Sequence, residues 1–240
     1  MMTIVLPAFN EERRLPSTLE SLLRWAENAP FAVDIIVSDD GSSDLTVDIA
    51  TAQASVNPIL SVLEASENLG KGAALKSGFG RARGDLVLFL DADLPIPVST
   101  IGELITSLGD ADILVGSRRA DGADITSAQP TVRRFGGRVF LAIVAAMGFG
   151  GTSDPQCGVK LLRASSTAAT VEQCVAQRFA FDIELIARAR LGGLTVVDHP
   201  VAWRHVDGST LRPLRDGIAT LRDLAHLRRQ LAGAADPTVR

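Results

Sequence analysis

The chain has 240 residues, of which 46% are hydrophobic and 22% charged, and its mean hydropathy is slightly positive. This composition is typical of a globular domain and excludes a disordered or collagen-like chain. The net charge of −4 argues against general nucleic-acid binding. Cys157 and Cys174 have no metal-ligand or redox spacing, which is typical of reduced cysteines in a cytosolic protein.

The charges divide unevenly between the two halves of the sequence. Residues 1–110 hold 7 Lys/Arg against 16 Asp/Glu, and residues 111–240 hold 17 against 12. An acidic half suits a cation site and a basic half suits an anionic partner, although drift in surface composition would give the same totals.

The sequence has no features of a membrane-spanning or secreted protein. Its N-terminus lacks the basic start and long apolar stretch of a secretory signal. The longest apolar run, Val139 to Phe149, has 11 residues and is too short to cross a bilayer. We expect a cytoplasmic chain that is soluble or lies on a membrane surface.

The first half alternates short apolar runs with helical patterns. The predicted strands are Thr3–Leu6, Asp34–Ser38, Ile59–Leu63, Leu86–Leu90 and Asp112–Val115. The predicted helices are Leu15–Asn28, Leu45–Ala54, Gly72–Ala82 and Pro97–Leu108, with Pro16 and Pro97 in first turns. Nearly continuous apolar strands separated by helices predict a doubly wound, mostly parallel α/β sheet with helices on both faces.

The regular alternation ends after Val115. A long loop is expected over residues 119–131, and a loop of that length inside a domain is usually functional. The later predicted elements are a helix over Arg133–Met147, a helix over Phe181–Leu191, a strand over Thr195–Val206 and an amphipathic helix over Leu211–Leu231.

The sharpest chemical motif is Asp91-Ala92-Asp93, directly after the apolar run Leu86–Leu90. Carboxylates two residues apart can point the same way, and such a pair can hold a hard cation while leaving positions for water and phosphate oxygens. The carboxyl edge of an open α/β sheet is also where ligands bind. A solvated turn is the simpler alternative for this motif taken alone.

Polar groups also follow the other predicted strands. Asp39 follows the second strand, where a carboxylate can accept hydrogen bonds from a ribose or a base, while Asp44 suits a structural role. Glycines flank Lys71 at a helix start, which lets a diphosphate approach. The Gly-x4-Gly-Lys-Ser/Thr spacing is absent, so ATP hydrolysis is disfavoured.

The order of these motifs resembles the family 2 glycosyltransferases of the GT-A fold. The matching segments are Pro7-Ala8-Phe9-Asn10-Glu11, Asp39–Asp44, Asn68-x-Gly70-Lys71-Gly72, Asp91-Ala92-Asp93-Leu94, Gly116-Ser117-Arg118, Asp154-x-Gln156-Cys157-Gly158-x-Lys160 and Phe181-Asp182-x-Glu184. Within that family the chain is similar to the polyprenyl-phosphate sugar synthases, and most similar to the dolichyl-phosphate β-glucosyltransferase branch. The resemblance implies a GT-A domain over residues 1–210, divided into a nucleotide-sugar half (1–116) and an acceptor half (117–210), and then a C-terminal helix and tail over 211–240.

The resemblance also implies roles for the matched residues. The donor side would comprise Pro7, Asn10, Glu11, Asp39, Lys71 and Ala92, and Asp91 and Asp93 would hold Mg²⁺ or Mn²⁺ against the diphosphate. On the acceptor side, Arg118 would face a phosphate together with Arg133 or Arg134, and Asp154, Gln156, Asp182 and Glu184 would lie near the sugar and the reacting atoms. Pro95 stands where many mannose synthases carry Gln, which weakens a mannose donor and leaves a third metal ligand open.

We therefore expect an inverting transfer of a hexose, with UDP-glucose or another UDP-hexose as donor, onto polyprenyl phosphate at the inner face of a membrane. A small membrane-protein partner is a further hypothesis. Transfer from GDP-mannose or a UDP-N-acetylhexosamine, transfer to a soluble hydroxyl acceptor, and a non-catalytic nucleotide-sugar-binding subunit remain alternatives.

Overall fold

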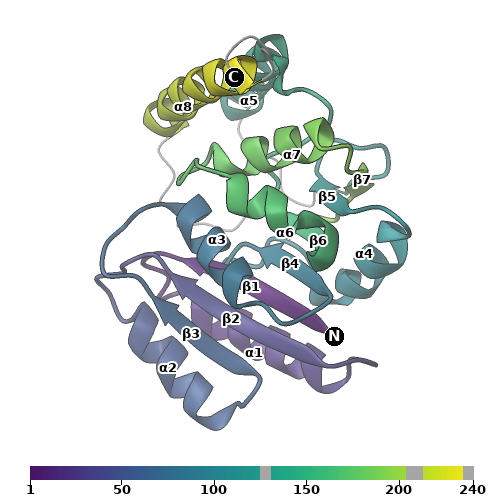
Figure 1. Ribbon diagram of the computed structural model, residues 1–240. Helices are drawn as coiled ribbons and strands as arrows, with labels where there is room; N and C mark the ends of the chain where they lie inside the picture. The colour runs from purple at the N-terminus through teal and green to yellow at the C-terminus, as the bar shows by residue number, and fades with distance from the viewer. Residues whose placement is uncertain (125–130, 204–212, 235–240) are drawn as a thin grey trace.

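The computed structural model describes residues 1–124, 131–203 and 213–234 (Figure 1). Within these ranges, seven strands form one sheet in the order β3-β2-β1-β4-β6-β5-β7. The strands are β1 (Met2–Ala8), β2 (Val33–Asp39), β3 (Leu60–Glu64), β4 (Leu86–Leu90), β5 (Ile113–Ser117), β6 (Val159–Arg163) and β7 (Val196–Pro200). The neighbours β3, β2, β1 and β4 are parallel, as are β5 and β7, while β6 runs antiparallel to both β4 and β5.

Helices cover both faces of the sheet. They are α1 (Leu15–Glu27), α2 (Thr46–Val56), α3 (Lys71–Arg81), α4 (Ile101–Leu108), α5 (Thr131–Val144), α6 (Ala164–Gln173), α7 (Phe181–Leu191) and α8 (Pro213–Ala234). A 3-10 turn, Val98–Thr100, precedes α4, and a π-helical turn, Ala145–Phe149, continues α5. The α/β fold expected from the sequence is thus confirmed.

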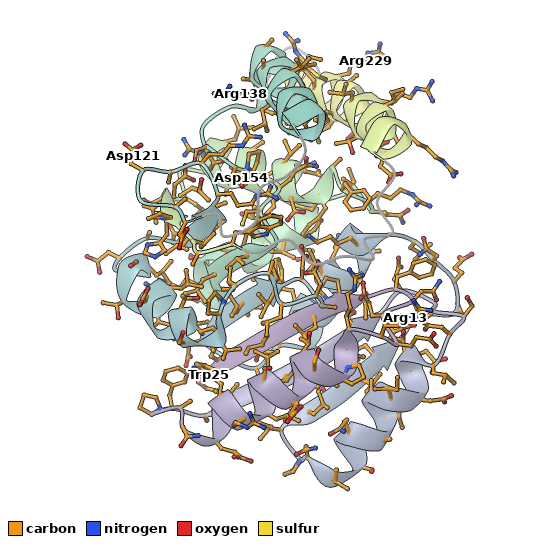
Figure 2. The ribbon with its side chains drawn as sticks, turned by 180° about the vertical axis from the view of Figure 1, so that it is seen from behind. Arg13, Trp25, Asp121, Arg138, Asp154 and Arg229 are labelled. Carbon is orange, nitrogen blue, oxygen red and sulfur yellow. The ribbon has the colours of Figure 1, made fainter. Side chains whose placement is uncertain are left out.

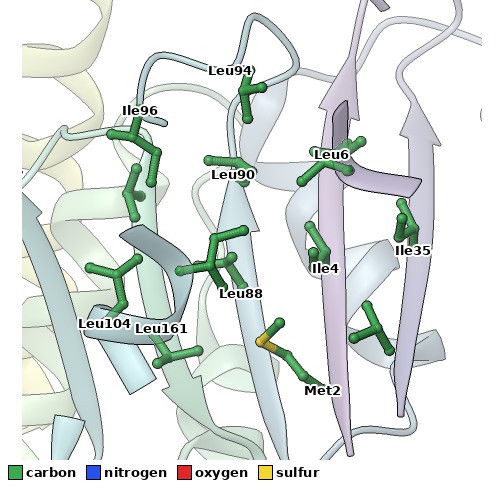
Figure 3. Close-up of a cluster of buried hydrophobic side chains, with 14 of the residues drawn as sticks. Met2, Ile4, Leu6, Ile35, Leu88, Leu90, Leu94, Ile96, Leu104 and Leu161 are labelled. Carbon is green, nitrogen blue, oxygen red and sulfur yellow. The ribbon is translucent and has the colours of Figure 1, made fainter. Parts of the chain in front are cut away.

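Two apolar cores lie on opposite faces of the sheet. One packs Ile4, Leu6 and Leu88 against α1 and α4 (Figure 3). The other packs Val5, Val87 and other residues of the strands against α3, α6 and α7. Alternate residues of one strand thus enter different cores, which explains why the strand sequences are apolar almost throughout.

A third, smaller apolar cluster joins the late helices. Val144 and Phe149 pack with Leu224 and Leu227 of α8 and with Ile183 of α7. Figure 1 shows α5 and α8 side by side, beyond α7 and away from the sheet. No helix in the described ranges is long and apolar enough to cross a membrane.

Several sequence-based expectations need correction here. Neither β6 nor α6 was predicted, and β6 is the strand inserted between β4 and β5. The strand expected over Thr195–Val206 ends at Pro200, and the helix expected from Arg133 begins at Thr131. Residues 125–130 of the loop expected over residues 119–131 lie outside the described residues.

Candidate active site

The carboxyl ends of β1, β2 and β4 meet at one edge of the sheet because these strands are parallel. A cleft of about 750 Å³ lies at this edge. Its walls come from the segments after β1, β2, β3 and β4, the start of α3, the segment before α7 and the first turn of α8. Of the residues predicted to bind donor or metal, Pro7, Glu11, Lys71, Asp91, Ala92 and Asp93 line it.

The acidic pair follows β4 at the floor of this cleft. Asp91 Oδ1 lies 2.7 Å from Lys71 Nζ, and Asp93 Oδ2 lies 3.7 Å from a guanidinium nitrogen of Arg14. The other oxygen of Asp93, Oδ1, is buried and has no hydrogen-bond partner among the described residues. Burial, followed by the negative charge of Asp91, raises the pKa of Asp93 although Arg14 and Lys71 oppose the shift.

The backbone around the pair holds it in place. The Asp91 amide donates to the Gly158 carbonyl at 3.0 Å, and the Thr18 hydroxyl donates to the Ala92 carbonyl at 2.7 Å. Leu94 adopts a positive φ of 47°, and its amide donates to the Asp91 carbonyl. This tight turn is an unusual conformation for leucine, and Leu94 is buried in the core beneath the site.

These residues fit a divalent cation. A buried carboxylate oxygen without a partner is costly unless a ligand satisfies it, and carboxylates are ligands that Mg²⁺ and Mn²⁺ prefer. In the part of the chain that is described, no group of three or more His, Cys, Asp or Glu side chains forms a complete ligand set. Asp91 and Asp93 would therefore leave coordination positions for diphosphate oxygens and water.

The predicted nucleoside residues divide into two groups. Glu11 lines the cleft and forms a bidentate ion pair with Arg14, at 2.5 and 2.6 Å; burial nevertheless raises the pKa of Glu11. Asn10 has a φ of 55° and accepts from the Ser43 amide, while Asp39 accepts from the Ser42 amide and hydroxyl. Asn10 and Asp39 thus shape the loops beneath the cleft.

Asp40 is the carboxylate after β2 that lines the cleft. It accepts hydrogen bonds from the Leu69 and Gly70 amides, which fixes the start of α3. Asp44 has the structural role expected of it, because it accepts from the amide and hydroxyl of Thr46 at the beginning of α2.

Behind Lys71 lies a buried carboxylate. Asp182 is 3% exposed, and its two oxygens lie 2.6 Å from Lys160 Nζ and 3.5 Å from Lys71 Nζ. Burial favours the neutral carboxyl, but the Lys160 and Lys71 ammonium groups lower the pKa of Asp182 overall. Asp182 is therefore an ionised anchor for two cations.

Other predicted acceptor-side residues lie outside the lining of the cleft. Asp154 forms a bidentate ion pair with Arg118 at 2.6 and 2.8 Å, and the Arg118 guanidinium lies over the Trp203 ring. Figure 2 shows Asp154 within the second half of the molecule. The Gln156 amide donates to the Phe179 carbonyl at 3.2 Å.

Glu184 is fully buried and serves its own segment of the chain. One oxygen accepts from the amides of Val175 and Ala176, and the other pairs with Arg188 at 2.7 Å. Both oxygens are thus engaged within this segment, and Glu184 is not among the residues that line the cleft. The side chains of Arg133 and Arg134 lie outside the described residues.

Sequence reasoning missed most of the cationic groups of the cleft. Arg14, Arg178 and Arg215 line it together with Lys71. Arg178 belongs to none of the motifs, and Arg215 is one of several arginines on an amphipathic helix. The sequence around them therefore gave no indication that either lines the cleft. Lys160 belonged to a matched motif, but its charge gave no indication of a buried strand position.

Comparison with known proteins identifies a matching family and relatives with a shared name. Glycosyl transferase family 2 matches residues 3–170. A dolichyl-phosphate beta-glucosyltransferase of Trichomonas vaginalis is 33% identical over 88% of this chain and 66% of its own length. The Drosophila melanogaster protein of that name is 32% identical over 93% of this chain and 73% of its own length. The chain thus spans about two thirds to three quarters of these relatives.

Among solved structures, a glucosyl-3-phosphoglycerate synthase from Mycobacterium tuberculosis in complex with Mn²⁺, UDP-glucose and glycerol 3-phosphate is similar with a TM-score of 0.68. It is 24% identical, and the match covers 93% of this chain and 79% of that one. This likeness supports the fold, and the family match extends over more than half of the sequence. The chain therefore belongs to glycosyl transferase family 2, and its domain has the GT-A fold.

Proposed function

We propose that this glycosyltransferase moves a hexose from a UDP-hexose, with UDP-glucose as the first candidate, to polyprenyl phosphate. The names of the relatives support both the glucose and the lipid phosphate. The proposed step is an inverting displacement in which an acceptor phosphate oxygen bonds to the anomeric carbon. The bond from that carbon to the diphosphate oxygen breaks, and UDP leaves with the electron pair.

The donor would lie in the cleft with its diphosphate toward the acidic pair. Asp91 and Asp93 would hold Mg²⁺ or Mn²⁺, whose charge stabilises a departing diphosphate. The ammonium of Lys71 and the guanidinium of Arg178 line the same cleft, and charged hydrogen bonds to phosphate position it as well as bind it.

One observation carries the choice of a phosphate acceptor: the two aspartates expected near the reacting atoms are already bound to cations. Asp182 is held by two lysines that lower its pKa, and Asp154 is held at both oxygens by Arg118. Neither is suited to removing a proton. A phosphate monoester, whose second pKa is about 6, is already anionic at neutral pH and needs no base.

The outer helices support a position on a membrane surface. Arg215, Arg222 and Arg229 are exposed and recur every seven residues along α8, which places them in one stripe of the helix. Figure 2 shows Arg229 and Arg138 at the end of the molecule formed by α5 and α8. Anionic headgroups attract basic residues of this kind.

Direct product detection tests the proposal. Purified protein is incubated with Mn²⁺, a polyprenyl phosphate in detergent and a mixture of UDP-glucose, UDP-galactose, UDP-N-acetylhexosamines and GDP-mannose, and the lipid fraction is analysed by mass spectrometry. A lipid-phosphate-hexose that requires a UDP-hexose supports the proposal. A lipid product from only GDP-mannose or an N-acetylhexosamine donor would contradict the donor assignment.

The Asp91→Asn variant is the matched control, because it keeps the shape of the side chain and should abolish turnover. Full activity in that variant would refute the assignment of the acidic pair. Donor binding without any lipid product, combined with transfer to a soluble alcohol, would favour the hydroxyl-acceptor alternative. That outcome would be accompanied by a large rate loss in Asp154→Asn or Asp182→Asn.

A further inference from the structure

Four charged side chains of alternating sign lead from the interior of the sheet to the acidic pair. The order is Lys160, Asp182, Lys71 and Asp91, and the closest nitrogen–oxygen distances between successive members are 2.6, 3.5 and 2.7 Å. Lys160 is 1% exposed, and its ammonium also donates to the Cys157 carbonyl at 2.8 Å. The inner end of this series is therefore fixed, and its outer end reaches the cleft.

Lys71 already occupies one oxygen of Asp91. The other oxygen, Oδ2, faces Gly158 so closely that a Cβ built on the glycine would lie 2.0 Å from it. Lys71 Nζ binds Oδ1 at 2.7 Å. A divalent cation approaching Asp91 from the cleft therefore meets an ammonium group already in contact with this carboxylate.

Lys71 lies at an electrostatically unfavourable position of its helix. It is the first residue of α3, where the helix dipole disfavours a positive charge. Its ammonium is drawn back to the two carboxylates instead of extending into solvent, and the side chain is only 18% exposed. The two carboxylates thus compensate a cation at an otherwise unfavourable site.

We propose that Lys71 acts as a built-in counter-ion, which holds the place of the metal beside Asp91 until metal and nucleotide-sugar enter together. This inference rests on the proposed metal-assisted transfer. When Lys71 leaves Asp91 it keeps Asp182 within reach, and Asp182 stays ionised because Lys160 holds its other oxygen. The donor diphosphate then offers the released ammonium a second anion.

The consequence is coupling between the binding of the metal and the binding of the nucleotide. Without nucleotide, Lys71 competes with the metal for Asp91, so the metal alone binds weakly. With nucleotide, the diphosphate accepts the ammonium and the competition ends. The same coupling requires that the metal strengthens nucleotide binding by an equal factor.

The test measures Mn²⁺ binding in the absence of donor and acceptor, from the electron paramagnetic resonance signal of free Mn²⁺. Lys71→Met should bind Mn²⁺ about tenfold more tightly than the unmodified protein, which corresponds to about 1.4 kcal/mol. Lys71→Arg keeps the charge and should stay within about threefold of the unmodified protein. In Lys71→Met, added UDP should strengthen Mn²⁺ binding by a smaller factor than in the unmodified protein.

Lys76→Met is the matched control. It removes the same charge from the same helix, but Lys76 binds the carbonyls of Glu172 and Cys174, so Mn²⁺ affinity should not change. Unchanged or weaker Mn²⁺ binding in Lys71→Met, in protein whose thermal transition shows that it is folded, would overturn the proposal. So would Mn²⁺ binding that survives Asp91→Asn in the Lys71→Met background.

The measurement does not depend on which sugar is transferred or which acceptor receives it. Failure to form a lipid-linked product would therefore count against the proposed function and leave the Mn²⁺ result intact. Conversely, normal lipid product with no tightening of Mn²⁺ binding in Lys71→Met would refute the counter-ion role alone.

Discussion

The contact between Gly158 and Asp91 makes a specific prediction about the alanine variant at position 158. A Cβ on Gly158 would lie 2.0 Å from Asp91 Oδ2 and 2.3 Å from Asp91 Cγ. Ordinary non-bonded carbon contacts are about 3.5 to 4.0 Å, so the carboxylate must move by more than about 1 Å. Backbone pairing between Leu90 and Val159 limits how far the main chain can yield instead.

The expected effect is large on activity and modest on stability. A displacement of about 1 Å at a positioned group costs about a hundredfold in rate, while one extra methyl in a packed site costs about 1 to 3 kcal/mol in unfolding free energy. Gly158→Ala should therefore lose at least about a hundredfold in kcat and bind Mn²⁺ more weakly, yet remain folded at 25 °C.

Sugar transfer, Mn²⁺ titration and chemical denaturation of the same preparation separate these effects. Gly102→Ala is the control, since nothing lies within 4 Å of a Cβ at that position of α4. Gly158→Ala protein with unimpaired activity and Mn²⁺ affinity would show that the close approach of Gly158 does not set the position of Asp91, and would refute the reasoning.

Three other predictions follow from the charges. Asp182→Asn should lose about 3 kcal/mol of unfolding free energy in urea denaturation because it leaves the Lys160 ammonium buried without an anion; Lys160→Met should cost less, and the reverse order would contradict this. Mn²⁺ affinity should fall as the pH is lowered, beginning above the ordinary aspartate range, because the raised pKa of Asp93 lets protons compete; a flat titration down to about pH 4 would argue against Asp93 as a ligand. Replacing Arg222 and Arg229 by Glu should weaken sedimentation with phosphatidylglycerol vesicles by at least about tenfold at low salt, and equal binding would exclude α8 as the contact.

The sequence was sufficient to predict several elements of the fold. Leu86–Leu90 and Phe181–Leu191 have the predicted bounds, and the other strands of the first half differ by a few residues. Strand β6 was missed because its five residues include Lys160 and Arg163, which interrupt the apolar run. Lys160 is buried only because Asp182 is placed beside it, and no local pattern encodes that pairing.

Likewise, part of the candidate site could be predicted from the sequence and part could not. Asp91 and Asp93 follow a recognisable strand, so their place at the edge of the sheet could be predicted. We expected Arg118 to face an acceptor phosphate; in the structure its guanidinium is bound to Asp154 and lies over the Trp203 ring. Partners so distant in sequence, such as Arg178 and Arg215 around one cleft, are determined by tertiary packing alone.

The placement of β6 has a consequence for how the chain folds as it is synthesised. Strands β1 to β4 can pair as soon as they are made, but both neighbours of β5, β6 and β7, come later in the sequence. Until β6 is made, β4 presents an open apolar edge of the kind that promotes aggregation. The nascent chain therefore passes through a stage in which Asp91 lacks its contact with Gly158. Its metal-binding geometry arises only when the antiparallel strand joins the sheet.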